Sequence, residues 1–201
     1  MTAPPIPQMC AHRPRRGGLV VPYVAFEHNN AVTFGALDPH KRTRAFTNRL
    51  CQVCERPLHD RFYVLVRPQD VSVGYAPEPG LHPPCLRYSE QACPMLSGTA
   101  STYRQGGVIA QHPAGRPCDD PDCPCPVTAS SDEDERRSGQ EAEDWDAWML
   151  PLEDYQLHHS GRGEPVGIVL PPKPLRIRRV RISPARERAL ALLAALQELG
   201  L

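Results

Sequence analysis

Short apolar runs bounded by turn residues predict strands along much of this 201-residue chain. Residues 19–26 and 31–37 are rich in β-branched and aromatic side chains, and the asparagines between them favour the tight turn of a hairpin. Residues 61–67 predict another strand, with 71–75 as its returning partner. A further apolar run, 166–170, predicts a strand near the C-terminus.

The clearest alternation of apolar and polar positions lies in residues 175–182. Leu175, Ile177 and, after a slip at two consecutive arginines, Val180 and Ile182 are expected to point inward, with arginines outward. Because side chains alternate between the two faces of a strand, this pattern predicts a half-buried strand with a basic outer face.

Three stretches carry the start signals of helices. Asp38 followed by Pro39 predicts a helix that reaches about residue 50. Two prolines after His82 favour the first turn of a helix that ends near residue 92. Ser183 and a following proline predict a last helix to residue 199. Its apolar stripe consists of Ala189, Leu192, Leu193, Leu196 and Leu199. We expect this stripe to cover the sheet, with dimerisation as the alternative.

Composition indicates long irregular segments around a small core. The chain holds 24 prolines and 14 glycines, and only 6% of its residues are aromatic. Residues 1–17 are rich in proline and arginine and are expected to be disordered. An acidic, serine-rich block within residues 128–147 is expected to stay solvated. The aromatic residues that follow, Trp145, Trp148 and Tyr155, are expected to dock on the body, with partner binding as the alternative.

Charge and hydropathy limit where the protein acts. The formal net charge is zero, although both ends of the chain are basic, and this neutrality argues against strong non-specific DNA binding. No apolar run approaches the length of a membrane span, and no secretion signal follows the basic N-terminus. We therefore expect a cytoplasmic protein without a membrane partner, whose eight cysteines stay reduced.

Cysteine and histidine spacing indicates a zinc site. Cys51 and Cys54 have two residues between them, and His82 and Cys85 repeat that spacing where a helix is expected to begin. Thiolate and imidazole are the donors that tetrahedral zinc prefers. A thioredoxin-like CxxC opens a helix after a strand, whereas strand-like sequence follows this pair, which disfavours a redox role. Cys93 is an alternative fourth ligand, although it lies over two helical turns beyond Cys85.

A second zinc ion has weaker support from the sequence. Three further cysteines and a histidine lie in a proline-rich stretch with irregular spacing. The possible second site comprises His112, Cys118, Cys123 and Cys125. The alternative is a solvent-exposed insertion without metal. Cys10 and His12, in the segment expected to be disordered, are not assigned to a metal.

These elements predict an α+β fold with a small zinc core. The chain is expected to form a tight turn that carries Cys51 and Cys54 (a knuckle), then a hairpin, then a helix with two ligands in its first turn. This order is similar to the treble-clef fold. The expected divisions are 1–17, disordered; 18–50, hairpin and helix; 51–97, zinc core; 98–147, cysteine-rich and acidic irregular insertion; and 148–201, C-terminal strands and helix packing on the core.

Several motifs resemble an uncharacterised family found in actinobacteria and their phages. They are the C-x-V-C knuckle at Cys51, the E-P-x-x-H-x-x-C helix start at Glu78 and the A-C-P-x-L end at Ala92. The resemblance covers about residues 20–97 well, and the C-terminal region only loosely. It implies a metal site but does not point to any activity, and the insertion 112–147 departs from the family pattern.

Three classes of function fit these observations, with a protein-interaction role ahead. A closed Cys₃His site has no open position for water, so the zinc is expected to be structural and the protein not an enzyme. A nucleic-acid-binding regulator is the alternative, using basic residues of the first helix and the last strand. These residues are Lys41, Arg42, Arg44, Arg49, Arg176 and Arg178. A metal-dependent nuclease of the HNH type has only His59-Asp60 in its favour.

Overall fold

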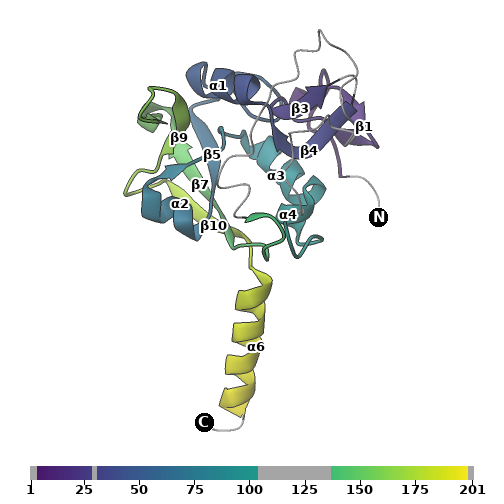
Figure 1. Cartoon of the computed structure of the whole chain (residues 1–201), viewed down its shortest axis with the longest axis vertical. Coiled ribbons are helices and arrows are strands. Elements are labelled where there is room, and N and C mark those ends of the chain that lie inside the picture. Colours follow the sequence, from purple (N-terminus) through teal and green to yellow (C-terminus); the bar gives the residue numbers. More distant parts are fainter. Residues whose placement is uncertain (1–3, 29–30, 104–136, 199–201) are drawn as a thin grey trace.

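The protein, seen in a computed structural model, is a mixed α and β fold, and its described residues form four small antiparallel sheets (Figure 1). The structure describes residues 4–28, 31–103 and 137–198. Its main sheet has the order β10-β7-β5, with β5 at Arg61–Val66, β7 at Trp145–Pro151 and β10 at Arg176–Arg181. The α+β class expected from the sequence is confirmed.

Strand β7 is central because both of its neighbours pair with it in antiparallel register. Trp148 lies opposite Val64 of β5 and opposite Ile177 of β10. Every residue of β5 after Arg61 is buried, as are Trp145, Ala147 and Leu150 of β7. The predicted docking of the aromatic stretch is thus confirmed: it docks as a strand of the main sheet.

The smaller sheets surround this centre. One has the order β6-β9-β8, with β6 at Tyr75–Ala76, β8 at Leu157–His159 and β9 at Pro165–Val169. Gly167 of β9 is needed for this pairing, because a Cβ there would lie 2.6 Å from the Ala76 carbonyl oxygen.

The two remaining sheets are hairpins near the N-terminus. They pair β1 (Arg15–Arg16) with β2 (Leu19–Val20) and β3 (Ala25–His28) with β4 (Ala31–Leu37).

Helices begin where the sequence signals place them. Asp38 caps α1, its carboxylate accepting bonds from the His40 and Lys41 N–H groups. The helices are α1 (Pro39–Thr47), α2 (Pro68–Val73), α3 (Pro83–Ala92), α4 (Pro94–Ser97) and α6 (Pro184–Glu198), with short 3₁₀ turns η1 (Gln8–Cys10) and η2 (Leu152–Asp154). Among the described residues, no helix is both long and apolar enough to cross a membrane.

The region after β5 differs from the expected returning strand. Residues 68–73 form α2, and β5 pairs with β7 from far along the chain. Only Leu81 returns to β5, in a bridge with Tyr63 in which each N–H donates to the other carbonyl at 2.8 Å. The hairpin expected of a treble clef is therefore reduced to one pair of residues.

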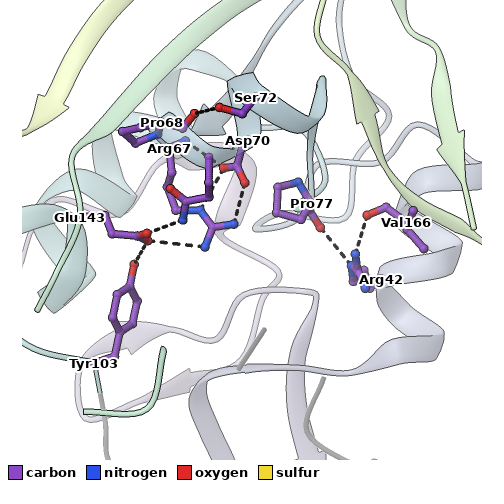
Figure 2. Close-up of polar contacts among 10 residues, drawn as sticks. Arg42, Arg67, Pro68, Asp70, Ser72, Pro77, Tyr103, Glu143 and Val166 are labelled. Atoms are coloured by element: carbon purple, nitrogen blue, oxygen red, sulfur yellow. Dashed lines mark hydrogen bonds and ion pairs between the residues drawn. The ribbon is translucent and has the colours of Figure 1, made fainter. Parts of the chain in front are cut away.

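A buried ion network occupies the turn between β5 and α2 (Figure 2). The Arg67 guanidinium, fully buried, donates to both carboxylate oxygens of Asp70 at 2.9 and 2.7 Å. Its Nη1 lies 3.7 Å from Glu143, which accepts the Tyr103 hydroxyl at 2.9 Å. Asp70 also caps α2 by accepting the Arg67 N–H. The network joins β5, α2 and the strand entering β7.

Two other expectations, for the N-terminal segment and for β10, differ from the structure. Residues 4–16, expected to be disordered, form η1 and β1 against the body. At β10 the inward pattern is wrong for Leu175, Ile177 and Ile182, which are 52%, 51% and 37% exposed, whereas Val180 packs against the core as expected. A bulge between Arg179 and Arg181 shifts the register and places Arg181, 6% exposed, opposite Trp145.

The last helix also departs from expectation, since α6 projects away from the body (Figure 1). It has no buried residue, so its leucines do not cover the sheet. It is fixed at its start, where the Asp144 carboxylate accepts the Ser183 N–H at 2.7 Å and the Arg186 guanidinium at 2.8 Å. Burial alone would raise the pKa of Asp144, but these bonds and that from Arg179 lower it to about 2.

Candidate metal centre

The first pair of donors lies on a tight turn between α1 and β5. The Cys51 N–H donates to the Arg56 carbonyl at 2.9 Å, and the Glu55 N–H donates to the Cys51 carbonyl at 3.0 Å. Glu55 closes the turn with a φ of 64°, a conformation unusual outside glycine. The turn therefore presents both cysteines to one side, and both are fully buried.

The second pair lies at the start of α3. His82 is the N-cap residue, and Cys85 follows in the first turn behind the two prolines. The Gln52 N–H donates to the Gly80 carbonyl at 3.0 Å, which ties the two halves of the centre together. Gly80 permits this close packing, since a Cβ there would lie 2.8 Å from both Leu58 and Phe62 side chains.

Four donor atoms converge between these two elements. The ligand atoms of Cys51, Cys54, His82 and Cys85 all lie within 4.8 Å of one another. Each of the four residues is 0% exposed. The predicted ligand set is thus brought together in a buried cluster that could hold a metal ion. Three sulfurs and one imidazole are a donor set that suits zinc.

The histidine is held in the orientation that a ligand needs. His82 Nε2 lies 2.9 Å from the Pro57 carbonyl oxygen, and a carbonyl can only accept, so Nε2 carries the proton. Nδ1 is then the nitrogen left to bind a metal, and it lies 3.3 Å from Cys54 Sγ. Such a carbonyl partner fixes the tautomer in many metal-binding histidines.

The electrostatics of the cluster favour a thiolate at its centre. Hydrogen bonds from the thiols of Cys10, Cys51 and Cys85 hold the pKa of Cys54 well below its ordinary value. Burial disfavours the charged form of His82, but bonds to the sulfurs of Cys51 and Cys54 raise its pKa to about 10. Without metal, a proton on Nδ1 would offset the thiolate charge; a metal cation would displace that proton and take the Nδ1 lone pair.

Other sequence candidates lie apart from the cluster. Cys93, the alternative fourth ligand, ends α3 as a partly buried thiol outside the converging group. The His59 ring packs 4.3 Å from the His82 ring but is exposed and supplies no converging donor. The possible second site of His112, Cys118, Cys123 and Cys125 lies outside the described residues.

One donor was missed by sequence reasoning. Cys10 is 0% exposed, and its Sγ lies 3.8 Å from Cys85 Sγ. No spacing signal could have found it, because 41 positions separate it from Cys51 and the surrounding proline-rich stretch resembles a disordered tail.

The basic residues considered for nucleic acid mostly serve internal contacts. Arg42 donates to the carbonyls of Pro77 at 3.1 Å and Val166 at 2.6 Å, joining α1 to β9 (Figure 2). Lys41 pairs with Glu27, Arg178 with Glu90 and Arg44 with Glu55. Arg49 lies over the Tyr155 ring. Arg176 is exposed on β10. These residues therefore do not form a shared basic surface of unpaired cations.

Comparison with known proteins adds no functional assignment: no family model, no curated protein and no solved structure matches this chain.

Proposed function

We propose that the protein binds one zinc ion through Cys51, Cys54, His82 and Cys85, and that this zinc is structural. The observation that carries the proposal is the convergence of four buried donor atoms within 4.8 Å. All four positions of a tetrahedron are filled by protein, so no position remains for a water or substrate. The resemblance to the actinobacterial and phage family supports the same site.

The position of the cluster explains what the zinc would stabilise. The knuckle follows α1, and the other two ligands lie at the start of α3, so one ion would link two segments that are otherwise joined by hydrogen bonds and packing. Structural zinc contributes about 10–16 kcal/mol of apparent binding free energy. We place the protein in the cytoplasm, where reducing conditions keep such thiols available.

We further propose a protein-interaction role for α6, with a second copy of this chain as its partner. Its leucine stripe, defined here as Ala189, Leu192, Leu193 and Leu196, runs along one side of the helix. Leu192 and Leu193 are 62% and 56% exposed. An apolar stripe on an α-helix normally packs against another element, and nothing in the described part of the chain covers this one.

An antiparallel pair of α6 helices would cover the leucine stripe of both copies. Arg186 and Arg188 at the start of the helix are already paired with Asp144 and Glu141, so the helix dipoles, rather than these charges, favour the antiparallel arrangement. Antiparallel packing brings opposite ends together and also opposes the two helix dipoles. Because α6 projects from the body, the two bodies would lie at opposite ends of the pair (Figure 1).

Light scattering coupled to size-exclusion chromatography tests this partner. We expect a dimer for the natural chain and a monomer for Leu193→Glu. Ala191→Glu is the matched control, since it adds the same charge on the face of α6 away from the stripe, and it should remain dimeric. A monomeric natural chain at high micromolar concentration, or dissociation of both variants, would contradict the proposal.

A further inference from the structure

The N-terminal segment lies over the metal centre and supplies a fifth sulfur. The 3₁₀ turn η1 buries Cys10 completely, 3.8 Å from Cys85 between the two sulfur atoms. Its thiol also interacts with that of Cys54. The neighbouring Met9 places its Sδ 3.3 Å from Cys85 Sγ, so the segment contacts the centre through two side chains.

Contacts on both sides of η1 fix this position. Arg13 Nη1 pairs with Glu55 of the knuckle at 3.0 Å, and its guanidinium lies over the Tyr23 ring. The Pro14 carbonyl accepts the Val21 N–H at 2.9 Å. Ile6 and Met9 pack against the main core. Cys10 is therefore held at the cluster by the fold.

The cluster thus contains more donors than one tetrahedral ion can use. Cys10 Sγ lies 3.8 Å from Cys85 Sγ, beside the four donor atoms that converge within 4.8 Å of one another rather than among them. Replacing His82 by Cys10 would change the donor set from three sulfurs with imidazole to four sulfurs. Both sets are common among structural zinc sites.

We propose that Cys10 is a reserve metal ligand that replaces His82. In the exchange the bond from the metal to Nδ1 breaks, the Cys10 thiol releases its proton to solvent, and its thiolate binds the metal. The site then carries one more negative charge and favours softer ions, because thiolate is the softer donor. The inference rests on the proposed zinc centre and extends it from a fixed site to one that retains metal through two donor sets.

Cobalt(II) is a suitable probe because tetrahedral thiolate ligation gives it strong charge-transfer absorption. All proteins would carry Cys118→Ser, Cys123→Ser and Cys125→Ser, so that the Co²⁺ absorption comes only from the metal centre described above. His82→Ala should still bind one Co²⁺, with charge-transfer intensity raised by about a third as four thiolates replace three. Adding Cys10→Ser to His82→Ala should weaken Co²⁺ binding by more than about tenfold.

The controls separate failure of this inference from failure of the zinc centre. Cys10→Ser alone should keep the natural spectrum but lose metal faster to a chelator, whereas Cys93→Ser should match the natural chain in both respects. If the natural chain binds no Co²⁺, the zinc centre itself is wrong. If the natural chain binds Co²⁺ but His82→Ala does not, or if adding Cys10→Ser changes nothing, Cys10 is no reserve ligand.

Discussion

The metal centre and α6 are held in opposite ways. At the metal centre every donor is fully buried, and η1, the knuckle and α3 surround it with backbone hydrogen bonds. Helix α6 has no buried residue and is held at its start by Ser183, Arg186 and Arg188. The difference teaches that this small protein buries its metal-binding chemistry and most of its aromatic side chains, and leaves the leucines of α6 exposed. The metal centre should determine whether the chain folds. Helix α6 should determine what the folded chain contacts.

Removal of a metal ligand should have the largest effect. Cys85→Ser is expected to lose metal and with it about 10 kcal/mol of folding free energy, which exceeds the stability of many domains. Metal analysis and a thermal melt by circular dichroism measure both losses. Cys93→Ser, outside the cluster, is the matched control and should keep the metal. A Cys85→Ser protein with a full metal content and a cooperative melt would show that the ligands are misassigned.

Breaking the buried ion network should come next. Arg67→Met leaves the buried Asp70 and the partly exposed Glu143 without their cation, which we expect to cost about 3–5 kcal/mol. Urea titration measures the loss. Arg176→Met, on the exposed edge of β10, should change stability by less than about 0.5 kcal/mol. If the two variants are equally stable, the network contributes nothing to holding β5 and β7 together.

The anchor of α6 should respond to acid. The pKa of Asp144 in the folded protein is about 2, below its ordinary 3.8, so its stabilisation is present above about pH 4. This stabilisation of the folded state by ionised Asp144 amounts to about 2 kcal/mol, and it is lost as the pH falls through 2. We expect Asp144→Asn to lower stability at pH 7 by that amount. The difference from the natural chain should vanish near pH 2, and a difference that persists there would refute this assignment.

Changes on the leucine stripe should affect stability least. Leu193→Glu is expected to change the free energy of unfolding of the isolated chain by less than about 0.5 kcal/mol, because the side chain is 56% exposed. Measured by urea titration at nanomolar concentration, where self-association is absent, a loss above 2 kcal/mol would mean that α6 packs on the body. The two regions would then not differ as described.

Local signals allowed much of the fold to be predicted from the sequence. Asp38 with its following proline places α1, and the prolines at 83 and 84 place α3. The paired spacing of Cys51, Cys54, His82 and Cys85 gave the converging cluster, because two tight turns bring donors together without long-range information.

Long-range contacts explain what the sequence could not show. The pairing of β5 with β7 crosses some eighty residues, and its choice over a local hairpin depends on burying Trp145 and Leu150. Leu175 and Ile177 are exposed although their alternation predicts burial, and the bulge that follows them places Arg181 opposite Trp145. Cys10 reaches the cluster through Arg13 and Glu55, a pair that no periodicity reveals.

X-ray absorption spectroscopy at the zinc edge, on untagged protein carrying Cys118→Ser, Cys123→Ser and Cys125→Ser, tests the central claim most directly. We predict one zinc per chain with three sulfur neighbours at about 2.3 Å and one nitrogen at about 2.0–2.1 Å. A zinc-free protein that is nevertheless folded, or a zinc surrounded only by oxygen and nitrogen, would contradict the account.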